Sequence, residues 1–307
     1  MITRRRALTI LAGATLLPAT GATASTAIGE WSGIALGAEA RIVLEHADAD
    51  RLIASAVSEI HRLEGIFSLY QPDSQLSRLN NDGILPDPGF EMIELLSVCA
   101  GLHARTNGAF DPTVQTLWAL YAQAVSQGSS PSPEDLKAAM DRTGWQHVRF
   151  SGDEVSFARR GMGLTLNGIA QGYIADRITQ LFRDQGVSNV LVNTGEISAL
   201  GRAPDGGSWN VTLANSGPNS GANSGRTQVP LSNAAIATSA PLGTTFDANG
   251  RLGHILDPRT GLAGGQWSQV SVVSNSAARA DGLSTAFCLM NKAEIAAARE
   301  DDRVFLR

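Results

Sequence analysis

The chain has 307 residues, 43% of them hydrophobic and 17% charged, and its formal net charge at pH 7 is −5. This length and this apolar fraction indicate a folded protein with a sizeable core, in one large domain or two modest ones. The acidic balance argues against nucleic-acid binding, because no basic face is available to neutralise phosphates.

The N-terminus has the pattern of a signal peptide. Three consecutive arginines, Arg4 to Arg6, precede an apolar run over 7–17 and the small-residue site Ala22-Thr23-Ala24. The stretch 3–8 resembles a twin-arginine signal, and an ordinary secretory signal with an arginine-rich start is the alternative. We therefore expect a signal peptide over residues 1–24, a mature domain over 25–307 and a periplasmic location. No later segment approaches 18 consecutive apolar residues, so no transmembrane segment is expected after signal removal.

Predicted strands and helices are intermixed along the mature chain. Alternating apolar residues predict strands over 39–47, 189–195 and 208–214, and a hairpin over 147–159. Helical spacing and capping residues predict helices after Asp48, from Asp87-Pro88 to about Arg105, from Ser132-Pro133, and over 168–186. The segment 66–83 is expected to be turn-rich. Residues 215–225 carry three Asn-Ser-Gly copies and are predicted to form a mobile surface loop.

This order predicts an α+β fold with mixed or antiparallel sheets and packed helices. A Rossmann fold would need Gly-x-Gly-x-x-Gly after its first strand; that motif and the Gly-x-x-x-x-Gly-Lys-[Ser/Thr] phosphate loop are both absent. Cys99 and Cys288 lie in apolar stretches, so we expect two free thiols rather than a disulfide or a zinc site.

Two glycine-containing segments are candidates for a functional site. The segment 253–261, Gly-His-Ile-Leu-Asp-Pro-Arg-Thr-Gly, is either a polar turn after a short buried strand or part of a site. Over 164–173, a strand is expected to lead into a helix through Asn167-Gly168. Backbone N–H groups at such a helix start can face an anion, and a packing turn is the alternative.

Two further segments place a carboxylate where it could act. Residues 107–114 put Asp111 after an aromatic residue in a turn that a glycine opens. Asp281 and Thr285 are four residues apart, which on a helix stacks their oxygens on one face and suits a hard cation such as Mg²⁺. Asp281 as a helix cap is the alternative.

Seven stretches follow one another in an order that resembles the ApbE family of FAD:protein FMN transferases over nearly the whole mature chain. They are FSLYQPDSQLSRLN (67–80), GAFDPTV (108–114), LNGIAQGY (166–173), LVNTGEISALG (191–201), AIATSAP (235–241), HILDPRTG (254–261) and ARADGLSTA (278–286). The resemblance implies an ApbE-like architecture related to the T-fold. It also implies an enzyme that binds FAD, uses a divalent metal, Mg²⁺, and transfers FMN to a Thr or Ser of a partner flavoprotein, with release of AMP. A membrane-associated acceptor is expected.

The resemblance assigns roles by position in these motifs. Asp281 and Thr285 match metal ligands, Gly168 matches a position that provides a backbone carbonyl, and Ser284 is a further metal candidate. His254 matches the proposed base for the acceptor hydroxyl, a role that suits an imidazole of pKa near 6.5. Besides His254, the cofactor-binding candidates are Leu36, Tyr70, Ala109, Phe110, Asp111, Thr165, Gln171 and Ile255.

The chain departs from the family pattern at several of these positions. Thr165 replaces a usual carboxylate and Gln171 a usual ammonium, and Leu36-Gly37-Ala38 and Ala240 are also unusual. The loss of one acidic and one basic group together is either compensated, with hydrogen bonds replacing a charge pair, or a cause of weaker FAD binding. The stretches LNGIAQGY and NTGEI resemble a NosX-like subgroup that serves the nitrous-oxide-reducing system. Two other functions stay open: an FAD pyrophosphatase that forms FMN and AMP, and a non-catalytic FAD-binding protein.

Overall fold

The computed structural model describes residues 28–213 and 227–307. The predicted signal peptide (1–24) and the predicted mobile loop (215–225) lie outside the described residues, and both stay predictions. Within the described part of the chain, no helix combines the length and the apolar character needed to cross a bilayer.

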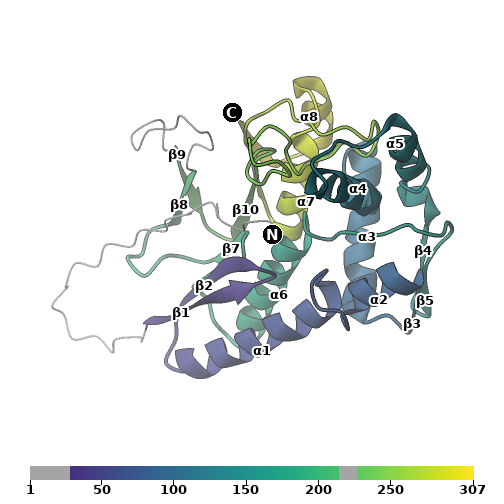
Figure 1. Ribbon diagram of the computed structural model, residues 1–307. Coiled ribbons are helices and arrows are strands. Elements are labelled where there is room, and N and C mark those ends of the chain that lie inside the picture. The colour runs from purple at the N-terminus through teal and green to yellow at the C-terminus, as the bar shows by residue number, and fades with distance from the viewer. Residues whose placement is uncertain (1–27, 214–226) are drawn as a thin grey trace.

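The main sheet has seven strands and lies to the left of α3, α4 and α5 in Figure 1. Its strands, in spatial order, are β1 (Ile28–Ala35), β2 (Ala38–Glu45), β6 (Val190–Asn193), β7 (Ile197–Leu200), β10 (Ala234–Ser239), β11 (Val270–Ser274) and β12 (Arg303–Leu306). Every neighbouring pair is antiparallel, and the sheet is open, with β1 and β12 at its edges. This topology confirms the predicted α+β class, because a Rossmann sheet is mainly parallel.

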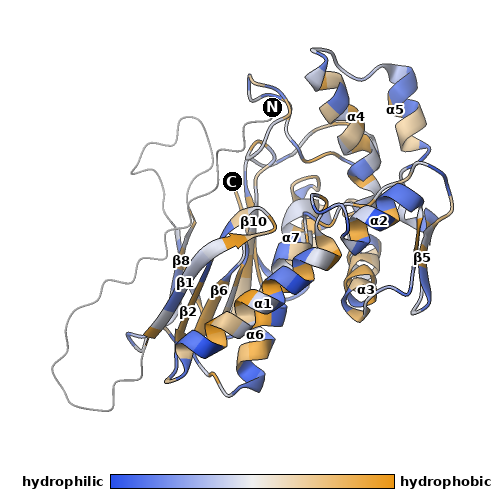
Figure 2. Cartoon of the chain, turned by 60° about the horizontal axis from the view of Figure 1, so that its bottom comes forward, coloured by the Kyte–Doolittle hydropathy of each residue, from blue (hydrophilic) through white to orange (hydrophobic). Residues whose placement is uncertain are grey.

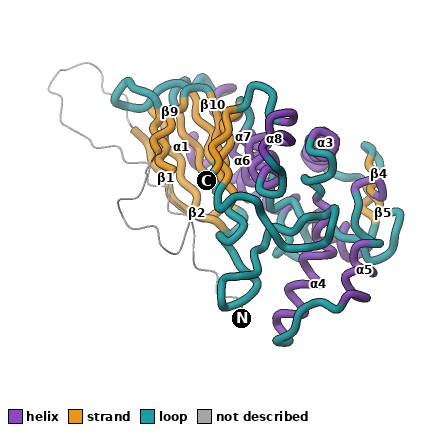
Figure 3. Tube along the Cα trace, turned by 90° about the horizontal axis from the view of Figure 1, so that it is seen from above, coloured by secondary structure: helices purple, strands orange, loops and turns teal. Residues whose placement is uncertain are grey.

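The two faces of this sheet are covered differently. Val190 and Val192 share a core with helices α1 (Ala49–Phe67), α6 (Ala170–Asp184) and α7 (Ala277–Phe287). Leu191, between them, packs in a second core with the ribbon of β8 (Trp209–Leu213) and β9 (Thr227–Leu231). Successive strand residues point to opposite faces, so one strand serves both layers. Figure 3 shows α6 and α7 beside the sheet.

A second group of elements packs beside the helical layer. It contains α2 (Gln75–Asp82), α3 (Phe90–Arg105), α4 (Gln115–Ser126), α5 (Pro133–Met140) and a small sheet of β3 (Ile84–Pro86), β5 (Glu154–Phe157) and β4 (Val148–Phe150). Two single-turn 3₁₀ helices, Pro112–Val114 and Trp145–His147, connect these elements, and α8 (Lys292–Ala298) lies near the C-terminus.

Several local predictions are confirmed. The apolar residues of α1 that share helical spacing are buried, and Figure 2 shows the mixed hydropathy of this amphipathic helix. Ser132 caps α5 by accepting a hydrogen bond from the N–H of Asp135 at 3.1 Å. The hairpin over 147–159 forms as β4 and β5, and Gly186 follows α6 with a φ of +82°. Cys99 and Cys288 are free and buried.

Other local predictions are wrong. The turn-rich segment contains α2, which Ser74 caps through the N–H of Ser77 and Gly83 ends in the left-handed conformation. Asp87 does not cap α3; its φ is +46° and Gly89 is the N-cap. The segment before Asn167 is not a strand, and around Ile255 there are only isolated bridges.

Candidate active site

A cavity of about 420 Å³ lies where the first turn of α6, the middle of α7 and the end of β10 meet. Cavities of this size are typical of small-molecule sites. The predicted site residues that line it are Tyr70, Ala109, Phe110, Asp111, Thr165, Gly168, Gln171, His254, Ile255, Asp281 and Thr285. The fold therefore brings together most of the candidates, from five separate stretches of sequence.

Asp281 is held inside this cavity by another helix. It lies within α7, whose N-cap is Ser276, so it is not a helix cap. Its Oδ2 atom accepts a hydrogen bond from the N–H of Gly172, in the first turn of α6, at 3.2 Å. The N-terminal turn of α6, which was predicted to face an anion, thus binds a carboxylate of the same chain. Burial raises the pKa of Asp281 to about 7, which the Gly172 bond partly opposes.

Glu196 is a second buried carboxylate in the same cavity, and the sequence interpretation did not assign it. It lies directly before β7 with 9% of its surface exposed, and its Oε2 atom accepts a hydrogen bond from the N–H of Thr238 at 3.1 Å. Burial, and then the charge of Asp281, raise the pKa of Glu196 well above its usual range. A lone charged residue within the otherwise uncharged stretch LVNTGEISALG was the only signal of it in the sequence.

Three hydroxyl groups, from the end of β10 and from α7, lie close to one another. Ser239 Oγ lies 2.7 Å from Ser284 Oγ and 3.3 Å from Thr285 Oγ1. Gly168 packs closely on the same threonine, since a Cβ atom at this glycine would stand 3.0 Å from Thr285 Oγ1. Ser284 itself does not line the cavity. Its hydroxyl donates a hydrogen bond to the carbonyl of Asp281 and is also hydrogen-bonded to the Ser239 hydroxyl.

Asp176 fixes α7 against α6. Its carboxylate accepts hydrogen bonds from the Ser276 hydroxyl at 2.7 Å and from the N–H groups of Ala277 and Ala278 at 2.8 and 3.0 Å. These donors are the otherwise unpaired groups of the first turn of α7. The helix that carries the lining residue Gln171 thus also positions the helix that carries Asp281.

Gln171 and Thr165 occupy the cavity wall without adding charge. The Gln171 side chain lies over Gly195, where a Cβ atom would stand 2.6 Å from its amide nitrogen and where φ is +104°. Thr165 Oγ1 accepts a hydrogen bond from the N–H of Asn167 at 3.2 Å. Only a glycine accommodates the backbone at 195, directly before Glu196.

His254 lies at the wall of the cavity with a defined tautomer. Its Nδ1 atom is 2.9 Å from the carbonyl oxygen of Thr244. Because a carbonyl only accepts, Nδ1 carries the proton and Nε2 keeps its lone pair in the neutral imidazole. Burial lowers the pKa of His254 from its usual value near 6.5, against the effects of the Thr244 and Pro241 carbonyls.

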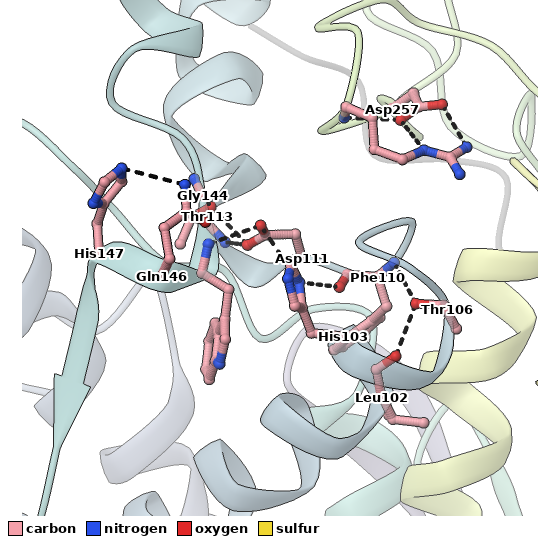
Figure 4. A network of polar contacts seen from close by, with 12 residues as sticks. Leu102, His103, Thr106, Phe110, Asp111, Thr113, Gly144, Gln146, His147 and Asp257 are labelled. Carbon is pink, nitrogen blue, oxygen red and sulfur yellow. Dashed lines mark hydrogen bonds and ion pairs between the residues drawn. The ribbon is translucent and has the colours of Figure 1, made fainter.

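The other polar residues of the segment 253–261 stabilise its turn. Arg259 donates to both carboxylate oxygens of Asp257, at 2.9 and 2.8 Å, and one of its nitrogens also reaches the carbonyl of Leu289 at 3.1 Å. Figure 4 shows this ion pair apart from the Asp111 network. Of the charged and titratable residues in this segment, His254 alone lines the cavity.

Asp111 also uses its carboxylate to hold the backbone. Figure 4 shows it accepting hydrogen bonds from the N–H and hydroxyl of Thr113, at 2.9 and 2.6 Å, and it also accepts one from the N–H of Trp145 at 3.0 Å. His103 Nδ1 approaches the same carboxylate at 3.6 Å and the Phe110 carbonyl at 3.0 Å. Asp111 therefore shapes the wall that Ala109 and Phe110 present to the cavity.

Leu36 is outside this site. It has a φ of +46° in the tight turn between β1 and β2, and its N–H donates to Glu64 Oε1 at 2.7 Å. It does not line the cavity, whereas Tyr70, 62% exposed, does so at the rim.

The donor atoms around Asp281 fit a hard divalent cation. Asp281 Oδ1 and Glu196 Oε1 accept no hydrogen bond from any residue over 28–213 or 227–307, and the Thr285 and Ser239 hydroxyls lie on the same cavity wall. Mg²⁺ prefers such oxygen ligands. No cluster of three or more His, Cys, Asp or Glu side chains with metal-site geometry occurs in the described residues, so hydroxyl or carbonyl oxygens would have to complete a site here.

Comparison with known proteins shows which family the chain resembles over most of its length. A profile of the ApbE family matches residues 36–305. The chain is 27% identical over 302 residues to the FAD:protein FMN transferase of Salmonella typhimurium, covering 92% of this chain and 85% of that protein. It is 30% identical over 246 residues to the protein of the same name from Vibrio cholerae, covering 77% and 72%.

A solved structure has the same fold. The crystal structure of the Pseudomonas stutzeri flavinyl transferase ApbE, apo form, superposes with a TM-score of 0.78 at 28% identity, covering 91% of this chain and 90% of that one. Because the family profile spans most of its length, the chain belongs to the ApbE family.

Proposed function

We propose that the chain is an FAD:protein FMN transferase, which moves the FMN half of FAD onto a Thr or Ser hydroxyl of a partner flavoprotein. The observation that carries this proposal is the meeting of His254, Asp281 and Thr285 in one cavity, from motifs that are distant in sequence. The relatives from Salmonella typhimurium and Vibrio cholerae are named for this activity.

The transfer needs a base for the acceptor hydroxyl. The hydroxyl oxygen bonds to the phosphorus of the FMN half, the phosphorus–oxygen bond to AMP breaks, and the hydroxyl proton must leave. His254 suits this role because its Nδ1–H is engaged by Thr244, which leaves the Nε2 lone pair to accept the proton. Its lowered pKa keeps the imidazole neutral at pH 7.

We propose that the reaction depends on a divalent cation, Mg²⁺. When bound, the cation supplies charge neutralisation at the pyrophosphate of FAD. Asp281, the Thr285 hydroxyl and the Gly168 carbonyl would hold it, and Ser284 would support them through Ser239. The hydrogen bond from Gly172 keeps one oxygen of Asp281 fixed, so the other is available to the cation.

A single assay tests the activity. The chain is incubated with FAD, Mg²⁺ and an acceptor flavoprotein domain that bears a target Thr or Ser. We expect covalently flavinylated acceptor and an equal amount of AMP. Free FMN and AMP without flavinylated acceptor would indicate an FAD pyrophosphatase, and unreacted FAD a non-catalytic binding protein; either result contradicts the proposal.

We also propose where the enzyme acts. The arginines at positions 4–6, the apolar run over 7–17 and the small-residue site after it support export by the twin-arginine pathway to the periplasm. The acceptor would then be a membrane-associated flavoprotein. The stretches LNGIAQGY and NTGEI support the NosX-like subgroup and a role in maturation of the nitrous oxide reductase system.

A further inference from the structure

We propose that Glu196 is a second carboxylate ligand of the cation site, so that a cation beside Asp281 is held by two acidic side chains. This inference rests on the metal dependence proposed above, and it concerns a residue to which the motif resemblance assigned no role.

The first argument is the position of the Glu196 carboxylate. It lines the cavity although only 9% of the residue is exposed, and the Thr238 N–H engages its Oε2 atom alone. Its Oε1 atom accepts no hydrogen bond from any part of the chain that the structure describes. A buried carboxylate oxygen without a donor is costly unless a cation or a proton compensates it.

The second argument is that Asp281 is held in the same way. One of its oxygens is bound by the Gly172 N–H, the other lacks a donor among the described residues, and only 3% of the residue is exposed. Two backbone amides, on β10 and α6, therefore fix one oxygen of each carboxylate and leave the second oxygens to the shared cavity. Neutral amides do not cancel the charge of this pair, and two carboxylate charges that line one buried cavity repel each other.

The third argument is the lack of a compensating side chain. No Lys or Arg is among the described residues that line the cavity, and Gln171 is one of the uncharged residues there. Its side chain lies over Gly195, next to Glu196 in the chain, and carries no charge. No side chain among the described lining residues supplies a compensating positive charge, so protons neutralise the carboxylates when no ion is bound, and a bound cation would take their place. With carboxylate and hydroxyl oxygens as donors, that ion is a hard divalent cation of the Mg²⁺ or Mn²⁺ type.

The test is a Mn²⁺ titration of the full chain, alone and with FAD, followed by electron paramagnetic resonance of free Mn²⁺. Glu196→Gln keeps the side-chain shape and an acceptor for the Thr238 N–H while removing the charge. We expect its dissociation constant for Mn²⁺ to rise about 10- to 100-fold. Glu154→Gln removes one charge at an exposed position of β5, outside the cavity, and is expected to bind Mn²⁺ as the unmodified chain does.

Glu196→Asp separates a ligand role from a packing role, because it keeps the charge and shortens the side chain. We expect it to bind Mn²⁺ more tightly than Glu196→Gln does. The inference would be overturned if Glu196→Asp weakened Mn²⁺ binding as much as Glu196→Gln, or if Glu154→Gln did so. Unchanged binding by Glu196→Gln, with binding lost in Asp281→Asn, would overturn it and leave the proposed metal dependence standing. If the unmodified chain bound Mn²⁺ neither alone nor with FAD, both this inference and the proposed metal dependence would be overturned.

Discussion

The N–H of Gly172 on α6 donates a hydrogen bond to Oδ2 of Asp281 on α7 at 3.2 Å, across 109 positions of sequence. This bond places the end of one helix against the middle of another and fixes one oxygen of the carboxylate. A substitution that keeps this bond but removes the charge of Asp281 can therefore be tested for two effects, one on turnover and one on the free energy of unfolding.

Asp281→Asn is expected to abolish Mg²⁺-dependent transfer of FMN while the fold is kept. The amide oxygen can still accept the hydrogen bond from Gly172, but it lacks the charge that a hard cation requires. Flavinylated acceptor is measured against Mg²⁺ concentration, with thermal unfolding as the check on folding. Normal turnover by a folded Asp281→Asn variant would show that Asp281 is not a metal ligand.

The same substitution should stabilise the metal-free protein at neutral and higher pH. Burial raises the pKa of Asp281 in the folded state to about 7 from an ordinary value of 3.8. Between these values the unfolded chain is ionised while the folded chain holds the proton, so the contribution of Asp281 to stability is fully present below about pH 4 and is lost as the pH rises through 7.

We therefore expect Asp281→Asn to melt above the unmodified chain at pH 8 in EDTA, and the two melting temperatures to converge toward pH 4. Each 1 kcal/mol corresponds to about 2–4 °C for a chain of this size. Comparing the two chains cancels the opposite trend from His254, whose lowered pKa costs stability as the pH falls below about 6.5. A constant difference from pH 4 to pH 8 would contradict the shifted pKa.

His254→Ala separates chemistry from binding. If His254 is the base, the variant should bind FAD normally while single-turnover transfer to the acceptor falls by about 10²–10⁴-fold. If His254 only stabilises its loop through Thr244, the loss of one hydrogen bond should cost about 1 kcal/mol. FAD affinity and melting temperature would then fall together, and bound FAD would turn over at the normal rate.

Asp176→Ala should weaken cation binding although Asp176 does not line the cavity. The substitution leaves the Ser276 hydroxyl and two N–H groups of α7 without their acceptor, at a cost of about 1–3 kcal/mol in the free energy of unfolding. Chemical denaturation measures this cost, and Mn²⁺ titration measures the effect on Asp281. Asp184→Ala, at the exposed end of the same helix, is the control and should change neither quantity.

Replacing Arg4 and Arg5 by Lys tests the export pathway. A twin-arginine signal requires both guanidinium groups, so we expect the precursor to accumulate in the cytoplasm. Cell fractionation followed by immunoblotting detects it. Unimpaired export of this variant would favour an ordinary secretory signal, for which a positive charge of either kind suffices.

The sequence by itself determined the parts of the structure that depend on near neighbours. The apolar spacing of α1, the Ser132 cap of α5 and the β4–β5 hairpin all follow from interactions within a few residues. Local reasoning failed for α2, because the apolar face of this eight-residue helix consists of only two side chains, Leu76 and Leu79. It also failed at Asp87, which has a left-handed φ of +46° and donates its N–H to the carbonyl of Asp153, a residue far away in the sequence.

Most of the site candidates named from the sequence motifs line the cavity, but only the tertiary structure decided what each one does. It assigned Asp257 and Arg259 to a turn, Asp111 to the backbone around Thr113 and Trp145, and Ser284 to a supporting position. Glu196 was recognised as a candidate site residue only from the tertiary structure. Its importance comes from burial and from the charge of Asp281, 85 positions away in the sequence, and neither quantity exists until the sheet and α7 have packed.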